Sequence, residues 1–419
     1  MKAILLTLLA AALAAPASGQ AHDAAPEQTV TLPALVTKAV HSNGELQGLR
    51  LELAALQARA EQAGLSPNPT LDYLREGDAA QGGARSWQLS IPLELGGKRS
   101  ARVDAAAADL AVAELALAAG VLRVQAETIA AYHDAYLAQQ RLALAERAAQ
   151  SGAQTALSTQ RRVKAGKVSP VDETRAQLAH AHLKIETIQA RSELGKAMLT
   201  LALLSGAAPD PSVRLASPQT ALPVVPNDKE IAARLLEGPS MQGAGAELAV
   251  RGAAVRLERA NRMPTIGLIV GTRREGLAQE RQTILGLSLP LPLRDRHQGA
   301  IREAQLRVEQ AETTVTATRQ RLLTEALQAA TRLQAALAEE QVLREDVLAG
   351  AASAYDATRK GFEAGKFGFL DVLDAQRSHV QAQTLHLRAI SQAHRAAAEL
   401  AALIGPTAPS NSSISIQDK

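Results

Sequence analysis

The chain carries the same residue pattern twice, in the same order, and this duplication limits its possible folds more than any other feature. The segment Ser90–Leu95 (SIPLEL) returns 198 residues later as Ser288–Leu293 (SLPLPL). Ala165-Gly166-Lys167 returns 199 residues later as Ala364-Gly365-Lys366. The proline-rich stretch 207–226 separates the copies and predicts a linker or a small side element. We therefore expect two repeats of one architecture, at 22–206 and 227–405.

The spacing of the prolines predicts long helices. No proline occurs between Pro92 and Pro170, and none between Pro292 and Pro406. Within each gap apolar residues recur at every seventh position, namely Val103, Leu110, Leu117, Val124, Ala131, Ala138 and Ala145, then Ile301, Val308, Val315, Leu322, Ala329, Ala336 and Leu343. A sustained seven-residue spacing is typical of coiled coils. We expect helices at 98–164, 170–205, 298–362 and 369–404, the first of them ~100 Å long.

Each repeat also holds a hairpin signal ahead of its long helix. Trp87, Leu89, Ile91, Leu93 and Leu95 alternate with polar residues or proline, and the leucines of 285–293 repeat this alternation. With partners at 70–75 and 265–272, these segments predict two hairpins, within about 69–95 and 264–293, each with one apolar and one polar face. The apolar segments approach the ~9–11 residues that a tilted strand needs to cross a bilayer.

Four strands cannot close a barrel, and an open sheet edge cannot face lipid because its backbone groups would lack hydrogen-bond partners. The apolar stripes of the long helices also need neighbours. Spacing alone therefore predicts an oligomer in which several protomers complete a membrane barrel that a helical tube continues. The predicted fold class is mainly α with a small β part: long antiparallel coiled-coil helices plus two transmembrane β-hairpins per protomer.

The first 21 residues predict a signal peptide. Lys2 precedes the short apolar run Ala3–Ala15, and small residues follow up to Ala21. The run is too short for a permanent membrane helix, and no later stretch reaches eighteen apolar residues. We expect an exported chain with no transmembrane helix and with a flexible C-terminal tail at 406–419.

Composition argues against several chemistries. The chain has no cysteine, so we expect no disulfide, no thiolate metal site and no lipid-anchored cysteine. The 45 Lys and Arg residues nearly balance the 42 Asp and Glu residues, and aromatic residues make up 2 %, so no nucleic-acid partner is expected. The 9 histidines are scattered, and no catalytic triad, phosphate-binding glycine loop or HExxH motif is visible. We predict no enzyme, no cofactor and no specific metal ligand.

In these features the chain resembles the TolC-like outer-membrane efflux proteins. The order of helix, hairpin, long helix, tight turn and helix is similar across nearly the whole mature chain, and the most specific segments are Arg162–Asp172 and Gly361–Gln376. Leu93–Arg99 and Gly365–Asp371 are most similar to the branch that serves cobalt-zinc-cadmium cation efflux pumps. The resemblance implies a homotrimer with a twelve-stranded barrel and a twelve-helix periplasmic tunnel.

The resemblance further implies the exit duct of a tripartite efflux pump, located in the outer membrane with a long periplasmic extension and exporting divalent cations such as cobalt, zinc and cadmium. The implied partners are outer-membrane lipid, a periplasmic adaptor protein and an inner-membrane pump of the resistance-nodulation-division type. The adaptor would contact the tip of the tube at Arg162, Gly166, Lys167, Val168, Ser169, Gly365, Lys366, Phe367 and Gly368.

These tip turns also have a plain physical explanation. Gly166 and Gly365 suit turns that need a positive φ, which lets two antiparallel helices reverse within a few residues. Ser169 and Pro170 suit the start of the returning helix. An ordinary helix–turn–helix would explain all of these residues equally well.

Asp371 and Asp374 are three residues apart and therefore share a helix face. By the resemblance they lie where the family narrows its tunnel, and symmetry would repeat them as rings of negative charge that attract cations. Arg175 occupies the place in the first repeat that matches Asp374 and is the predicted tether for it. Solvated surface charges are the alternative explanation.

Three other functions stay open. The same duct could serve organic drugs or type I protein secretion. A periplasmic coiled-coil scaffold without a pore accounts for the heptads but leaves the two amphipathic hairpins unexplained. A metalloenzyme or a metal-storage protein would need a ligand cluster that the sequence lacks.

Overall fold

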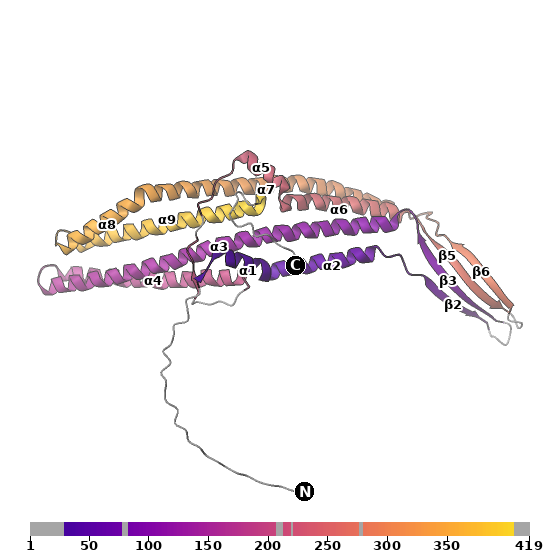
Figure 1. Cartoon of the computed structure of the whole chain (residues 1–419), viewed down its shortest axis with the longest axis horizontal. Coiled ribbons are helices and arrows are strands. Elements are labelled where there is room, and N and C mark those ends of the chain that lie inside the picture. The colour runs from indigo at the N-terminus through magenta and orange to yellow at the C-terminus, as the bar shows by residue number, and fades with distance from the viewer. Residues whose placement is uncertain (1–28, 78–82, 207–212, 219–220, 276–279, 406–419) are drawn as a thin grey trace, which may run out of the picture.

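The computed structural model describes residues 29–77, 83–206, 213–218, 221–275 and 280–405. The predicted signal peptide and C-terminal tail lie outside the described residues, as does part of the predicted linker. The chain forms an elongated body in which a layer of long helices continues at one end into a four-stranded sheet (Figure 1).

The first half contains, in chain order, β1 (Thr29–Val30), α1 (Leu32–Ser42), α2 (Gly44–Ala63), β2 (Thr70–Glu76), β3 (Ala84–Glu94), α3 (Lys98–Lys164) and α4 (Pro170–Leu204). The second half contains β4 (Arg214–Leu215), α5 (Asp228–Glu237), α6 (Pro239–Asn261), β5 (Thr265–Glu275), β6 (Glu280–Ser288), α7 (Gln298–Val342), the π turn η2 (Leu343–Val347), α8 (Leu348–Glu363) and α9 (Phe369–Ile404). The described chain is mainly helical with a small sheet part, which confirms that level of the predicted fold class.

Small residues let the helices pack closely. Gly120 of α3 faces α2, where an added Cβ would lie 2.6 Å from the side chain of Leu49. Gly152 of α3 faces α4, where an added Cβ would lie 2.5 Å from Leu183. Buried alanines such as Ala135 and Ala389 continue these contacts along the helices. The alanine-rich heptads therefore serve close helix packing, as coiled-coil spacing requires.

The span predicted as a long helix at about 298–362 is helical from Gln298 to Glu363, but it contains a π turn, η2, at Leu343–Val347. Just before η2, Glu340 is buried although it is charged. Its Oε1 lies 3.2 Å from Nε of Arg344 and 3.2 Å from Nε2 of His386 on α9. The wider π turn thus coincides with a buried carboxylate whose partners lie on its own helix and on the neighbouring one. A heptad pattern gives no sign of such a pair.

The last predicted strand also ends earlier than its leucine alternation suggested. β6 stops at Ser288, whereas the alternation runs to Leu293. Pro290 and Pro292 have no N–H to donate to a neighbouring strand, so the ladder cannot continue through them. Leu289, Leu291 and Leu293 remain exposed in the single chain.

A short parallel strand pair joins the start of the described chain to the segment between the halves. Val30 of β1 pairs with Leu215 of β4. The hydroxyl of Tyr132 on α3 lies 3.1 Å from the carbonyl oxygen of Val30 and 2.7 Å from that of Ala216. The stretch between the repeats therefore includes a side element packed on the middle of α3.

Among the described helices, α3 alone is long and apolar enough to cross a membrane by length and composition, although it holds no run of eighteen apolar residues. Only 11 % of its apolar window is buried within the chain. Alanine counts as apolar in such a test but leaves little bulk on a helix surface. This exposed alanine-rich face is suited to packing against further helices.

Candidate functional site: the helical tip, the groove and the sheet

The two helical turns farthest from the sheet have the same backbone. The amides of Gly166 and Lys167 donate to the carbonyl oxygens of Val163 and Arg162, and the amides of Gly365 and Lys366 donate to those of Phe362 and Gly361. These are two Schellman motifs, in which a left-handed residue ends a helix. Gly166 and Gly365 have φ values of 71° and 75°, as the predicted turns require.

The returning helices start differently. The Oγ of Ser169 accepts a hydrogen bond from the amide of Val171 at 3.3 Å, and Pro170 is the first residue of α4. At the second turn the carboxylate of Asp371 accepts a hydrogen bond of 2.9 Å from the amide of Gly368. Lys167 and Lys366 are exposed, and Val168 is half-buried. The predicted tip residues therefore form two exposed turns with different side chains.

One contact joins the two turns. Nη2 of Arg162 donates to the carbonyl oxygen of Phe362 at 2.6 Å, and its guanidinium lies 4.2 Å from the centre of the Phe362 ring. The ring of Phe367 packs over Gly361, where an added Cβ would lie 2.1 Å from Cδ2 of the ring. Arg162 was predicted as a tip residue, but its partner Phe362 was not. The contact spans 200 residues of sequence, so no local pattern signals it.

Within one protomer the residues predicted to form a charged constriction make no hydrogen bond or ion pair with one another. Asp371 and Asp374 are both exposed. Asp371 caps α9 as described, whereas Asp374 has no hydrogen bond or ion pair to the described part of the chain. Nη1 of Arg175 lies 3.9 Å from Oδ1 of Asp172 on its own helix. A tether from Arg175 to Asp374 stays a prediction.

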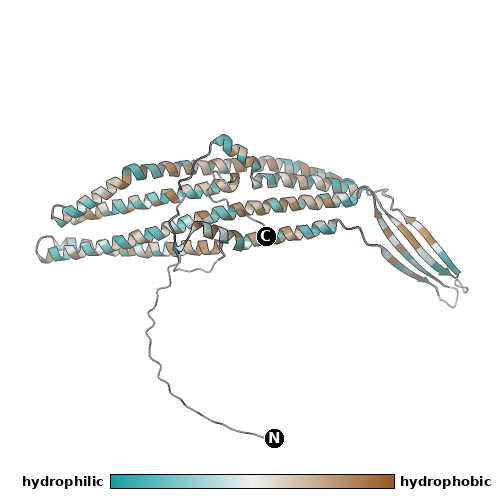
Figure 2. Ribbon diagram, viewed as in Figure 1, coloured by the Kyte–Doolittle hydropathy of each residue, from teal (hydrophilic) through white to brown (hydrophobic). Residues whose placement is uncertain are grey.

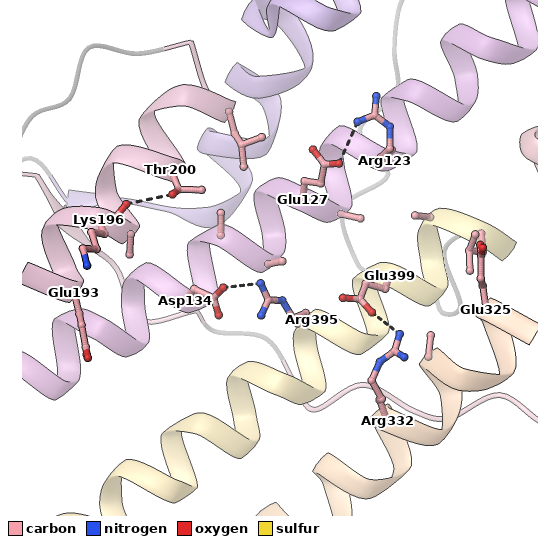
Figure 3. A pocket seen from close by; sticks show the side chains of 18 residues that line it. Arg123, Glu127, Asp134, Glu193, Lys196, Thr200, Glu325, Arg332, Arg395 and Glu399 are labelled. Atoms are coloured by element: carbon pink, nitrogen blue, oxygen red, sulfur yellow. Dashed lines mark hydrogen bonds and ion pairs between the residues drawn. The ribbon is translucent and has the colours of Figure 1, made fainter. Parts of the chain in front are cut away.

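A groove of about 870 Å³ runs between α3, α4, α7 and α9, and charged side chains line it (Figure 3). Arg395 of α9 reaches Asp134 of α3 at 2.9 Å, and Arg332 of α7 reaches Glu399 of α9 at 2.7 Å. The lining has five carboxylates and four cationic groups, namely Glu127, Asp134, Glu193, Glu325 and Glu399 with Arg123, Lys196, Arg332 and Arg395. A wall of mutually paired charges suits contact with water.

This groove lies on the side of α3 that faces away from the small parallel strand pair. Tyr132, which bonds to that pair, and Asp134, which lines the groove, are two residues apart on the helix. Two residues turn an α-helix by ~200°, so the two side chains leave α3 in nearly opposite directions. The helical layer therefore has one face covered by β1 and β4 and one charged, open face.

Two histidines stack where the halves meet. His133 of α3 and His394 of α9 have ring centroids 4.2 Å apart and nearly parallel planes. Burial and, to a smaller extent, the neighbouring His394 lower the pKa of His133 to about 3. Burial also lowers the pKa of His394. Both rings are therefore neutral near pH 7. Among the described residues no three His, Cys, Asp or Glu side chains gather closely enough to hold a metal ion.

The register of the strands gives the sheet two chemically different faces. Its strand order is β2-β3-β5-β6, with every neighbouring pair antiparallel. In register, Leu71, Leu89, Val270 and Leu285 share one face. The other face carries Gln88, Ser90 and Glu94 of β3 and the glycines Gly267, Gly271 and Gly286. One face thus suits lipid and the other suits water.

Both edges of the sheet are open in a single chain. β2 is exposed along its whole length and pairs only with β3, and β6 pairs only with β5. An unpaired edge presents a row of N–H and C=O groups to its surroundings. Such edges cannot face hydrocarbon, so the sheet needs neighbours.

Long antiparallel helices that continue into a two-faced antiparallel sheet define the TolC-like class of outer-membrane channels. The chain belongs to the outer membrane efflux protein family, whose model matches residues 35–207 and 231–406. It is therefore an outer-membrane efflux channel, and its helices form the periplasmic extension.

Particular relatives are similar over most of the chain. It is 35 % identical to the cobalt-zinc-cadmium resistance protein CzcC of Cupriavidus metallidurans, over 90 % of each chain. It is 28 % identical to the nickel and cobalt resistance protein CnrC of the same organism, over 64 % of each chain. A membrane protein from Pseudomonas aeruginosa has a similar structure, with a TM-score of 0.76, 23 % identity and 90 % of each chain covered. CusC gives a TM-score of 0.74 at 18 % identity, over 90 % of this chain and 92 % of CusC.

Proposed function

We propose that the chain forms the exit duct of a tripartite pump that exports divalent metal cations across the outer membrane. The observation that supports divalent metal cations as the exported substrate is the 35 % identity to CzcC over nine-tenths of both chains. CzcC is named for cobalt, zinc and cadmium resistance. The names of CnrC and of the nickel-cobalt-cadmium resistance protein NccC point to the same class of ion. Metal ions are the substrate in this proposal and have no resident site.

The duct is a homotrimer in this proposal. The open edges of β2 and β6 support it, because a third of a closed barrel would have two such edges. Three copies of the four-stranded sheet give twelve strands, and the exposed alanine face of α3 then packs against a neighbouring protomer. The charged groove faces the passage, on the side of the helices opposite β1 and β4.

The tip turns meet a periplasmic adaptor that is tied to an inner-membrane pump. Their exposed lysines, Lys167 and Lys366, and the half-exposed ring of Phe367 support this role. Exposed aromatic rings are enriched at interfaces between proteins, and the lysines would attract an acidic partner. The symmetry of the trimer would present six such turns at one end of the tube.

Asp371 and Asp374 form rings of negative charge at the tip that select cations. We expect the double substitution Asp371→Asn and Asp374→Asn to lower cation selectivity, measured as the reversal potential of single channels in a planar bilayer under a salt gradient. Asp374→Asn alone is the sharper variant, because Asp371 also caps α9 whereas Asp374 makes no contact to the described chain. Unchanged current and selectivity in the double variant would contradict the ring.

Growth of a deletion strain tests the cargo. The strain, with and without the gene restored, is grown across zinc, cobalt, cadmium, nickel and copper salts and a panel of organic drugs. Sensitivity confined to divalent metals and reversed by the gene is the expected result. Sensitivity confined to organic compounds would be consistent with an efflux duct but would contradict metal cations as its substrate.

A further inference from the structure

Four arginines form one continuous row across the sheet. Arg75 of β2 pairs in register with Arg85 of β3, Arg85 pairs with Arg274 of β5, and Arg274 pairs with Arg281 of β6. Residues directly opposite each other on neighbouring strands point to the same face. The arginine row, Arg75, Arg85, Arg274 and Arg281, therefore lies on a single face and spans about 14 Å at ~4.8 Å per strand.

The residues next to the row identify that face as the apolar one. One step toward the helices, Tyr73 pairs with Trp87 and their rings lie 4.6 Å apart, while Thr272 pairs with Thr283. The next step is wholly aliphatic, with Leu71, Leu89, Val270 and Leu285 in register. This order of aliphatic band, aromatic residues and then charge is the order found from the middle of a membrane to its surface.

The row lies at the end of the sheet away from the helices, next to the hairpin loops, where Figure 2 shows the strands turning hydrophilic. Because the helices extend into the periplasm, this end faces the exterior. The row thus lies at the depth of the lipid headgroups in the outer leaflet.

No acidic group on the same face balances this charge among the described residues. All four arginines are exposed, and none has an ion pair within the described chain. The nearby carboxylates belong to the other face, where Arg273 lies 3.2 Å from Glu76 and 3.4 Å from Glu275. Like charges directly opposite each other on neighbouring strands destabilise a sheet. Within the described chain the row therefore has no counter-ions, and anions bound from outside would neutralise its charge.

We propose that the arginine row binds the phosphate groups of the glycolipid that forms the outer leaflet of the membrane. This inference rests on the proposed insertion of the sheet into that membrane. Each guanidinium presents a planar fork of donors that matches a phosphate in bidentate geometry. Four forks side by side can engage several phosphates at once, and closure of the proposed trimer would extend the row around the barrel.

The test uses the full-length protein in lipid nanodiscs and three variants. The first replaces all four arginines of the row by Gln. The second replaces them by Lys, which keeps the charge but not the fork. The control removes four exposed arginines from the helices that likewise have no ion pair in the described chain, namely Arg147, Arg256, Arg302 and Arg319.

Native mass spectrometry then counts the lipids that stay bound after release from nanodiscs doped with diphosphoryl lipid A or with its dephosphorylated form. We expect the Gln variant to retain diphosphoryl lipid A about tenfold less than wild type, the Lys variant to fall between them, and the control to match wild type. Dephosphorylated lipid should be retained weakly by all four proteins. Equal retention by the Gln variant and wild type would overturn the proposal.

A protein that fails to enter nanodiscs even as wild type would instead count against the proposed membrane insertion. If the quadruple Gln variant does not insert, Arg274→Gln with Arg281→Gln tests the same row on β5 and β6 alone. Equal retention of the two lipids by wild type, with inorganic phosphate bound by wild type but not by the Gln variant, would show an anion site unrelated to lipid and would overturn the assignment.

Discussion

The two halves of the chain build matching helices with different interiors. In the first half α3 continues for 67 residues, whereas the matching span of the second half is divided into α7, η2 and α8. The positions that match Glu340 and His386 in the duplication are Leu142 and Thr187. There the Oγ1 of Thr187 donates to the carbonyl oxygen of Ala145 at 3.3 Å, and the helix stays regular. The second copy of the duplicated backbone thus holds a buried ion pair, and its helix contains a π turn that the first copy lacks.

The two tip turns likewise have matching backbones but different side chains. Position 361 of the second half matches Arg162 of the first. The first tip therefore has a cation where the second has a glycine, and the space above that glycine is filled by Phe367. The hydrogen bond from Arg162 goes to the backbone of residue 362, but the cation–π contact needs the ring of Phe362, and the matched residue in the first half is Val163. Divergence at this pair of positions therefore adds a contact between the two tips.

The buried pair of the second half should give the largest effect. We expect His386→Leu to lower the free energy of unfolding by about 3 kcal/mol, because it leaves the carboxylate of Glu340 buried with only Arg344 beside it. Urea titration in detergent, followed by circular dichroism, measures this loss. The double variant Glu340→Leu with His386→Thr gives the second half the residues of the first. It should restore stability and convert the π turn η2 to regular α-helix. A double variant no more stable than the single one would contradict this account.

The histidine stack has no counterpart at the matched positions, which are Thr331 and Gly195. Because the pKa of His133 falls to about 3 on folding, the unfolded chain binds a proton near pH 6.5 that the folded chain does not. Stability should therefore fall as the pH drops below 6.5, by about 2 kcal/mol between pH 6.5 and pH 5 for this group. The same urea titration repeated across pH measures this slope.

Replacing His133 by Gln should flatten that pH dependence without abolishing folding at pH 7. An unchanged slope in the His133→Gln variant would assign the acid sensitivity to other groups.

The two tip glycines should behave alike because their backbones are alike. An added Cβ at Gly166 or Gly365 meets nothing within 4 Å, so Ala at either site suffers only from the left-handed backbone. We expect a loss of about 1 kcal/mol at each site. Gly361→Ala is the contrast, because it displaces the ring of Phe367 and has no equivalent in the first tip. Unequal costs at Gly166 and Gly365, measured as shifts in urea midpoint, would show that the turns differ beyond their side chains.

The contact between the tips should give a local effect. Arg162→Gln removes a hydrogen bond and a cation–π contact at a half-buried site, which together contribute about 1 kcal/mol. Hydrogen exchange of the second turn should become several-fold faster, as read by mass spectrometry. Arg162→Lys keeps the charge and should have an intermediate rate. Identical exchange in all three proteins would mean that the tips do not support each other.

Local patterns were enough to predict a mainly helical, duplicated chain with amphipathic hairpins, because prolines, glycines and heptads act over a few residues. The π turn was missed because the heptads place a charged residue, Glu340, on the buried seam seven residues after Leu333, and its partner His386 lies across the helix pair. The arginine row was missed because Arg75, Arg85, Arg274 and Arg281 come together only through strand register. Hairpin geometry sets that register, and alternation alone does not determine it.

The near-equal lengths of the two helical spans have a consequence for how the protein can change over evolution. α3 is about 100 Å long at 1.5 Å per residue, and Gln298–Glu363 has nearly the same length. Removing one heptad from one span and its returning helix would draw that turn back by about 10 Å. Arg162 would then no longer reach Phe362. The length of the helical part is therefore set by both halves together. An insertion or deletion in the helices of one half must be matched in the other half to keep the two tip turns in contact.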